Sequence, residues 1–309
     1  MTAAYVVLAH DDPHMLRRLL GALEGAPTII HLDARVDLQS FERVARVGAL
    51  ENARYASIRT PVNWGGYSAV RTMLSAGDEL GREVSRNDHL VFVSGRCYPL
   101  RPVREFYDFL ARSEWRQHCR AYDLKAAGQW HLDRIALRHG FDGFSTRLGR
   151  HGTLRRRLTR RLLKEANRLS PRLTTALKPV AGSQWMALTT ECFNEAREAT
   201  ASAEYAIFLN SFAPDEMAIQ TFVHNSRWSL ETRFLGAEQS GDFKVSSYPN
   251  FHALDPKMIG SVSSESVRAA LPDQFFARKF DSIRDEALLN RIDHECQREE
   301  LGERDGRSR

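Results

Sequence analysis

The stretch Ser211–Phe222 holds the residues whose types and spacing are best suited to chemistry. Pro214 is typical of the first position of a helix, where its missing N–H costs nothing, so the sequence predicts a helix that begins there. Asp215 and Glu216 then fall in the first turn, beside unpaired amides and the positive end of the helix dipole. They could simply stabilise that dipole, by about 0.3–1 kcal/mol each. Alternatively, the dipole keeps a carboxylate ionised at the edge of a cleft, where it can accept a proton.

Strands that alternate with helices over the first hundred residues favour a doubly wound, mostly parallel sheet. Short apolar runs predict strands at Tyr5–Ala9, Pro27–Asp33, Ala56–Ile58 and His89–Gly95, the last of them covered on both faces. Helices are predicted from Pro13 and over residues 38–47, 68–80, 102–110, 191–200 and 261–271, with a turn into a strand over 180–188. Residues 111–140 show no clean period, and residues 236–249 are rich in loop formers, so neither segment receives an element.

Several polar and aromatic residues lie at or beyond the carboxyl ends of predicted strands. In a doubly wound sheet, ligands bind beyond the carboxyl ends of the strands. His10, His31, Asp33, Trp64 and the stretch Ser94–Tyr98 all occupy such positions. Histidines there are often structural, an aspartate can merely end a strand, and a tryptophan can belong to the core. Spacing alone leaves both interpretations open.

Composition bounds the class of protein. A chain of 309 residues with 42% hydrophobic and 27% charged residues is typical of a globular protein with a sizeable core. No signal peptide and no apolar run of about 18 residues is present, so a cytoplasmic location is expected. The four cysteines are widely spaced without a C-x-x-C pair, which favours buried reduced thiols over disulfides or a metal site.

The net charge of +5 comes from one segment. Between Thr146 and Lys178 there are eleven Lys or Arg residues and one acid, Glu165, so the remainder holds 33 basic and 38 acidic residues. We expect a single domain over residues 1–302 with a basic helical insertion at about 146–178, and a disordered tail at 303–309. The insertion could be a solvated helix face, or it could contact an anionic glycan or the inner membrane surface, where each basic residue adds about 1 kcal/mol. Nucleic acid is not expected, since residues 147–178 contain no aromatic residue.

Motifs that are missing exclude several kinds of site. The chain has no G-x-G-x-x-G, no P-loop, no H-E-x-x-H and no G-x-S-x-G. It also has no Asp-x-Asp pair, on which many nucleotide-sugar transferases hold a divalent metal. If the protein handles a diphosphate, cationic side chains must therefore offset the charge.

Four sequence blocks, taken in order, resemble one enzyme family. They are Ile30–Asp33 with Asn63–Val70, Val93–Leu100, Gly182–Trp185 with Pro214–Glu216, and Phe276–Asp281. Their order and spacing, over nearly the whole chain, are similar to those of the core-2/I-branching β-1,6-N-acetylglucosaminyltransferases, a family that includes the peptide O-xylosyltransferases. The resemblance implies a GT-A-type fold and inverting, metal-independent transfer, without a cofactor, of N-acetylglucosamine or xylose from a UDP-sugar. The acceptor would be a hydroxyl of a glycan or a lipid-linked glycan.

The resemblance also implies roles for particular residues. Glu216 would be the catalytic base, and Lys279 would bind the departing diphosphate. The second cation could be Arg278, which is adjacent to Lys279. Neighbours on a strand point to opposite faces, however, so Lys257 in the preceding loop is a rival. The expected nucleotide and donor contacts are His10, His31, Asp33, Ser94, Gly95 and Tyr98. The expected contacts to donor sugar and acceptor are Trp64, Gly182, Ser183, Gln184, Trp185 and Asp215.

One position departs from the family pattern. Cys97 stands where the second block usually carries Asp, which removes a hydrogen-bond acceptor for the nucleoside. Eukaryotic members carry a membrane anchor and disulfides. Neither is expected in this chain, so it resembles a bacterial relative that acts in polysaccharide biosynthesis. The alternative to an enzyme is a non-catalytic protein of the same fold that binds a nucleotide sugar or an anionic glycan.

Overall fold

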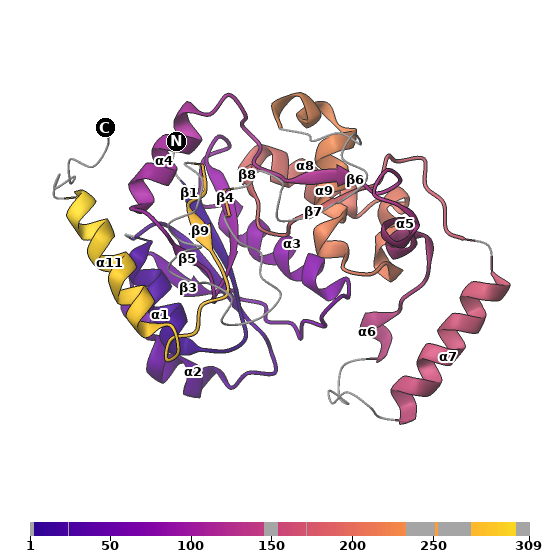
Figure 1. Cartoon of the computed structure of the whole chain (residues 1–309), viewed down its shortest axis with the longest axis horizontal. Coiled ribbons are helices and arrows are strands. Elements are labelled where there is room, and N and C mark those ends of the chain that lie inside the picture. Colours follow the sequence, from indigo (N-terminus) through magenta and orange to yellow (C-terminus); the bar gives the residue numbers. More distant parts are fainter. Residues whose placement is uncertain are drawn as a thin grey trace.

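A central sheet with helices on both faces organises the molecule (Figure 1). The computed structural model describes residues 3–23, 25–144, 154–170, 172–232, 251–252 and 273–300. The strands are β1 (Ala3–Ala9), β2 (Thr28–Leu32), β3 (Ala53–Tyr55), β4 (His89–Ser94), β5 (Tyr98–Pro99), β6 (Ala121–Asp123), β7 (Val180–Gly182), β8 (Ala187–Thr189) and β9 (Phe276–Ala277). The α-helices are α1 (Pro13–Ala22), α2 (Leu38–Ala45), α3 (Ser68–Gly81), α4 (Val103–Arg112), α5 (Gln129–Ala136), α6 (Phe141–Phe144), α7 (Leu154–Leu169), α8 (Thr190–Thr200), α9 (Ala218–Asn225) and α11 (Glu286–Glu300). Short 3-10 turns are η1 (Val47–Ala49), η2 (Ala203–Asn210), η3 (Pro214–Glu216) and η4 (Arg227–Glu231).

The main sheet has the strand order β3-β2-β1-β4-β8. The first four strands run parallel, and β8 pairs antiparallel with β4 at the edge. In the register, Ala9 lies opposite Leu32 and Leu8 opposite Ser94, so the carboxyl ends of β1, β2 and β4 meet at one edge. The predicted doubly wound, mostly parallel sheet flanked by helices is therefore confirmed, and it has the GT-A-like arrangement that the resemblance implies.

Alternating side chains of β1 serve two separate cores. Val6 packs in a cluster with α3, α8 and α9, while Val7 packs in a second cluster with α1, α2 and α4. Because both faces of the strand are covered, its sequence is an unbroken apolar run and does not alternate with polar residues. Burial of these side chains, each worth about 1.5–3 kcal/mol, fixes the strand ends on which the site is built.

Local signals placed most of the elements correctly. The helix predicted from Pro13 is α1, and Asp12 caps it, since its Oδ1 accepts a hydrogen bond from the amide of Met15 at 3.0 Å. The third strand was predicted at Ala56–Ile58 and lies instead at Ala53–Tyr55. The strand contains a charged residue, Arg54, which interrupts the apolar run expected of a buried strand. Ion pairs with Glu79 and Glu83, in and just after α3, neutralise this charge in the folded protein.

The helix predicted to start at Pro214 is the most consequential error. Pro214–Glu216 forms the short 3-10 turn η3, and Met217, with φ −135°, separates it from α9. Asp215 and Glu216 therefore do not lie in the first turn of an α-helix, and the dipole of α9 does not explain their state. The break has a local cause, since the amide of Met217 closes a tight turn onto the carbonyl of Pro214.

The stretch 111–140 contains β6 and α5, which its sequence did not reveal. The basic insertion is helical as predicted over α7, which lies at the end of the long axis opposite α11 (Figure 1). The helix predicted at 261–271, the loop at 236–249 and the tail at 303–309 lie outside the described residues. In the part of the chain that the structure describes, every helix is too short or too polar to cross a membrane.

Candidate active site

Glu216, the predicted base, forms an ion pair with an arginine that the sequence did not single out. Its Oε2 accepts a hydrogen bond from Nη2 of Arg134 at 2.6 Å, and its side chain is 38% exposed. Arg134 itself is buried in α5. A buried guanidinium favours the carboxylate form of its partner and limits where that carboxylate can move. Arg134 thus takes the part that the sequence assigned to a helix dipole.

Arg134 also holds the loop that precedes the carboxylates. Its guanidinium donates to the carbonyls of Phe212 and Ala213 at 3.4 and 3.3 Å, and its own carbonyl accepts from the amide of Phe212 at 2.7 Å. Ala213 has a φ of 52°, in the left-handed region that residues with a Cβ seldom occupy. Such strain persists only where the surroundings enforce it, and it is concentrated at functional sites.

Asp215 presents a buried carboxyl oxygen next to this pair. Its Oδ1 is sealed from solvent and accepts no hydrogen bond from the described residues, although part of the side chain reaches the surface. Burial, and then repulsion from Glu216, raises the pKa of Asp215 to about 7, against the opposing attraction of Arg134 and Arg278. Two adjacent carboxyl groups therefore differ in kind, because one is paired with an arginine and the other favours its protonated form.

Arg278 and Lys279 reach different groups. The guanidinium of Arg278 lies 4.6 Å from the centre of the Trp185 ring and close enough to Asp215 to affect its pKa. Lys279 instead helps to lower the pKa of Asp11, the residue two positions beyond β1. These different partners fit the expectation that Arg278 and Lys279 point to opposite faces. The rival cation, Lys257, lies outside the described residues.

The two candidate tryptophans have opposite environments. Trp185 is buried and stacks on His252 with 6.1 Å between ring centres, so it behaves as a core aromatic. Trp64 is 79% exposed, and its ring is supported by edge contacts to Phe141 and Phe212. An exposed indole on a rigid aromatic base is suited to stacking against a sugar ring.

Trp64 is also tied to the carboxylate loop. The amide of Ala213 donates to the carbonyl of Gly65 at 3.0 Å, immediately beside the tryptophan. Asp142 of α6 holds the same turn, since its carboxylate accepts from the amide and hydroxyl of Ser68 at 2.7 and 2.6 Å. The exposed ring and Glu216 are therefore parts of one supported unit.

The stretch Gly182–Trp185 positions backbone and does little with its side chains. A Cβ on Gly182 would come within 1.7 Å of the carbonyl oxygen of Arg120, so only glycine fits opposite β6. Ser183 is buried, and its carbonyl accepts from Nε2 of Gln220 at 2.8 Å while its hydroxyl accepts from the amide of Trp185 at 3.1 Å. Gln184 is half-buried between them. This loop connects β7, which pairs with β6, to β8 of the main sheet.

His31 and Asp33, predicted as nucleotide contacts, are engaged inside the protein. Nε2 of the buried His31 accepts a hydrogen bond from the amide of Thr60 at 3.0 Å, and burial lowers the pKa of this imidazole. Burial opposes ionisation of Asp33, but hydrogen bonds from Arg35 and from the amide of Val62 outweigh it and lower the pKa to about 2. Both residues hold the loop after β2 in place. A nucleotide donor that contacts them would have to bind the same polar atoms that make these internal hydrogen bonds.

The residues after β4 divide in the same way. A Cβ on Gly95 would lie 3.2 Å from that of Ala9, so this glycine permits the close approach to β1. The hydroxyl of Ser94 lies 3.2 Å from Sγ of Cys97, and the same sulfur lies 3.3 Å from Nε2 of His252. Cys97 is fully buried, so the thiol at the usual aspartate position contacts a histidine of this chain. The hydroxyl of Tyr98 donates to Asp293 of α11, which places it on the side of the C-terminal helix.

A second arginine that the sequence did not single out, Arg96, fastens the C-terminal segment to the strand ends. Its guanidinium pairs with Asp11 through two hydrogen bonds of 3.0 Å and with Asp12 and Asp281 at 3.0 Å each. It also donates to the carbonyl of Phe280, next to Lys279. His10 lies beside this cluster, exposed, with Nε2 3.6 Å from Asp11. Arg96 thereby fixes the chain that carries Arg278 and Lys279.

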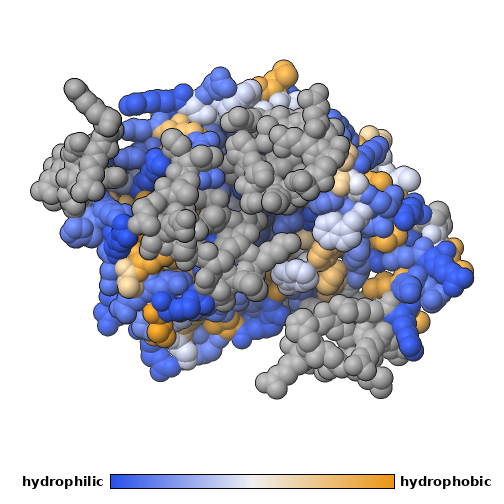
Figure 2. All heavy atoms as spheres, viewed as in Figure 1, coloured by the Kyte–Doolittle hydropathy of each residue, from blue (hydrophilic) through white to orange (hydrophobic). Residues whose placement is uncertain are grey.

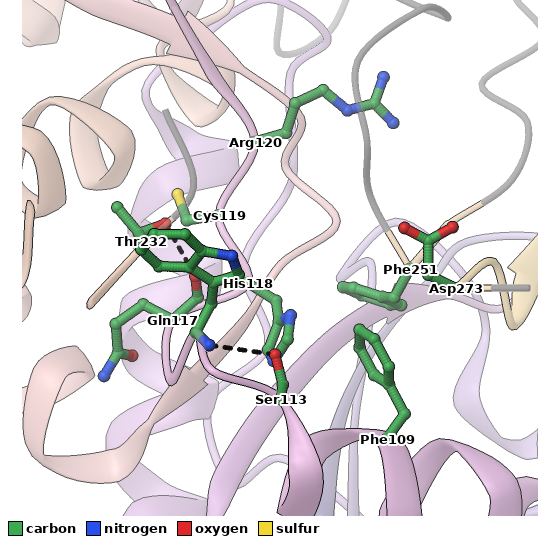
Figure 3. A pocket seen from close by; sticks show the side chains of 10 residues that line it. Phe109, Ser113, Gln117, His118, Cys119, Arg120, Thr232, Phe251 and Asp273 are labelled. Carbon is green, nitrogen blue, oxygen red and sulfur yellow. Dashed lines mark hydrogen bonds between the residues drawn. The ribbon is translucent and has the colours of Figure 1, made fainter. Parts of the chain in front are cut away.

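A separate cavity of about 100 Å³ lies between the end of α4 and β6 (Figure 3). Its lining includes the aromatic rings of Phe109 and Phe251 and the opposite charges of Arg120 and Asp273. None of the predicted site residues lines it. Its lining is therefore distinct from the group around Glu216.

Metal ligands do not converge in the part of the chain that the structure describes. No group of three or more His, Cys, Asp or Glu side chains there is arranged to hold an ion.

Comparisons with known proteins identify the family of the chain. The family model described as Branch, core-2/I-branching enzyme, matches residues 3–233, about three quarters of the chain. No curated protein matches the chain. Among solved structures, the chain is similar to a protein assigned as a glucose-1-phosphate thymidylyltransferase from Bacillus anthracis, crystallised with a sucrose; identity is 10% and the TM-score 0.37, over 76% of this chain and 87% of that one. The matched range contains Trp64, Arg134 and Glu216 but ends before Arg278 and Lys279.

Proposed function

Because the chain belongs to the core-2/I-branching enzyme family and is therefore a glycosyltransferase, we propose that it carries out inverting transfer without a metal ion. The donor is a UDP-sugar that supplies N-acetylglucosamine or xylose, and the acceptor is a hydroxyl of a glycan or a lipid-linked glycan. The observation that carries the proposal is the partly exposed Glu216 carboxylate, held by buried Arg134 on a loop that is hydrogen-bonded to the turn carrying exposed Trp64.

The reaction is a single displacement at the anomeric carbon of the donor sugar. Glu216 takes the proton of the acceptor hydroxyl while the oxygen forms its bond to that carbon. The bond between the carbon and the diphosphate oxygen breaks on the opposite side, UDP leaves, and an α-linked donor therefore gives a β linkage. General base catalysis of this kind contributes about 10²–10⁴-fold.

Arg134 acts as a positioning residue. It keeps the proton-accepting carboxylate in one place, and the same guanidinium fixes the strained turn at Ala213 from which that carboxylate projects. Pre-organisation of this kind lowers the barrier because the geometry of attack is established before the substrate arrives. Trp64 would stack against the acceptor or donor ring, and Arg278 and Lys279 would offset the charge of the departing diphosphate.

Removal of the carboxylate tests the assignment. Glu216→Gln should lower kcat about 10²–10⁴-fold with little change in KM for the donor, because the amide keeps the shape but cannot accept the proton. Glu231→Gln is a matched control, since Glu231 is 32% exposed and pairs with Arg116 at 3.2 Å in η4. Transfer and hydrolysis of UDP-sugars would be followed with a chelator present.

Three outcomes would overturn parts of the proposal. Full turnover in Glu216→Gln would exclude this residue as the base. Loss of wild-type turnover on addition of the chelator would show that a metal is required. Negligible turnover of every UDP-sugar by the wild-type protein, combined with a raised Tm in a screen of UDP, GDP, CMP and their sugars, would favour a non-catalytic binding protein.

A further inference from the structure

Helix α7 carries a strong positive charge. Its sixteen residues include seven Lys or Arg and one acid, Glu165, a net charge of +6. The acid pairs only with Arg168 of the same helix, at 3.7 Å, among the described contacts. Figure 2 shows mainly hydrophilic atoms with some hydrophobic ones at the edge of the molecule where α7 lies. The catalytic proposal makes no use of this element.

The C-terminal half of α7 is anchored to the body on one side. The side-chain amide of Asn167 accepts from the amide of Arg138 and donates to its carbonyl, both at 2.9 Å. Just beyond the helix, Arg172 pairs with Asp133 of α5, and the amide of Leu173 donates to the carbonyl of Ala136 at 2.9 Å. These contacts fix which side of α7 faces the protein.

The opposite side carries exposed leucines. Leu162 and Leu169 are 63% and 82% exposed. With roughly 100° of rotation per residue, their positions lie about 220° and 200° around the helix from Asn167 in the same rotational sense, so both face away from it. Large apolar side chains that point away from the protein, next to exposed Arg161, Lys164 and Arg168, form an amphipathic surface with a basic flank.

We propose that α7 docks on the surface of a membrane that contains anionic phospholipid. A helix lying in the interface buries its leucines at the boundary of the acyl chains, while its basic side chains stay among the headgroups. The positive charge supplies the complement to an anionic leaflet, where each Lys or Arg contributes about 1 kcal/mol. Because α7 is anchored through α5, which holds Arg134, docking would bring the transferase site close to a lipid-linked acceptor.

Charge argues against the other occupants of this surface. A second copy of the chain would bring two helices of net charge +6 against each other, which is repulsive. Nucleic acid is matched in charge, but the exposed leucines have no place in a phosphate interface, and residues 147–178 offer no aromatic ring to stack on bases. An anionic lipid surface alone makes use of both the charge and the apolar residues.

Flotation of the full chain with lipid vesicles tests the proposal without any sugar substrate. The wild type should bind vesicles of phosphatidylcholine with one third phosphatidylglycerol and not vesicles of phosphatidylcholine alone. Leu162→Ser with Leu169→Ser, and separately Arg161→Glu with Arg168→Glu, should each weaken binding at least tenfold. Ile283→Ser is the matched control, because Ile283 is similarly exposed but lies beside α11, and it should bind like the wild type.

The proposal fails if binding is the same to both vesicles, or if either double variant binds like the wild type. It also fails if the chain binds a single-stranded oligonucleotide or another copy of itself more tightly than the anionic vesicles. Because all four changed positions in α7 are exposed, far-ultraviolet circular dichroism and Tm should match the wild type. The single variant Leu162→Ser, with a smaller loss of binding, gives an independent check. Vesicle binding is measured apart from turnover, so failure here leaves the transferase assignment standing.

Discussion

Replacement of Asp215 by asparagine should stabilise the protein in a pH-dependent way. The pKa of this carboxyl rises from 3.8 to about 7 on folding, first because of burial and second because of repulsion from Glu216. A difference of about 3 units, at about 1.4 kcal/mol for each, corresponds to roughly 4 kcal/mol. The effect on stability is at most this large, because part of the side chain reaches solvent, which screens its charge.

The sign follows from proton binding in the two states. Above pH 3.8 the unfolded chain releases the proton of Asp215, whereas the folded chain keeps it until about pH 7. The folded state therefore binds more protons in this window, and the wild type loses stability as the pH rises through it. Asparagine has no proton to lose, so the free energy of unfolding of Asp215→Asn should exceed that of the wild type by an amount that grows from near zero at about pH 4 to as much as about 4 kcal/mol at pH 8.

Urea denaturation of both proteins across this range provides the measurement, with the difference between midpoints taken at each pH. Glu216→Gln is an informative companion, because it removes the second cause of the raised pKa and should shift the pH window to lower values. An advantage of Asp215→Asn that does not vary with pH would refute the reasoning. A growing disadvantage at high pH would show that Arg134 and Arg278 stabilise an ionised Asp215 more than burial penalises it.

Two further substitutions probe function and packing. Trp64→Ala should leave Tm nearly unchanged, since the ring is exposed, but should raise KM for the acceptor about tenfold through loss of stacking. Trp130→Ala removes another exposed tryptophan and should leave this KM unchanged. An unchanged KM in Trp64→Ala would exclude the stacking role. Gly182→Ala should destabilise the protein by about 3 kcal/mol or more, because its Cβ would clash with a backbone carbonyl, and a fall in Tm of roughly 5 °C or more would be measured. Gly21→Ala in α1 is the control, with no atom within 4 Å of the added Cβ, and should be neutral or stabilising; equal Tm values for the two variants would contradict the packing argument.

The sheet could be predicted from sequence because its signals are local. Apolar runs such as that of β4 report burial on both faces, and Asp12 with Pro13 marks a helix start without reference to the rest of the chain. The β3 error shows the limit of this reasoning. The charge of Arg54 is neutralised by Glu79, whose position beside the strand depends on tertiary structure.

The candidate site was less predictable, because its determinants are contacts between distant segments. Arg134 lies in a stretch without periodicity, and only the fold brings it to Glu216, 82 residues later. A faint signal existed, since Arg134 precedes the apolar pair Ile135 and Ala136 on the buried face of α5. The identity of Trp64 and Trp185 gave no indication of their exposure, which depends on whether other segments cover them.

The charges around Arg278 and Lys279 indicate which of the two cations interacts more strongly with the donor phosphates. Lys279 lies near Asp11, in a cluster where Arg96 already pairs with three carboxylates, so a diphosphate would meet an environment rich in negative charge there. Arg278 lies near Asp215, whose pKa of about 7 leaves that carboxyl largely protonated below neutral pH and unable to cancel the guanidinium.

We therefore infer that Arg278 carries more of the interaction with the donor phosphates than Lys279 does. Arg278→Met should raise KM for the donor more than Lys279→Met, and the difference should shrink as the pH rises above about 7, because ionised Asp215 then offsets the charge of Arg278. Donor KM measured against pH for the two variants decides the matter. A larger effect of Lys279→Met at every pH would instead place the diphosphate at the end of β1, despite the carboxylates there.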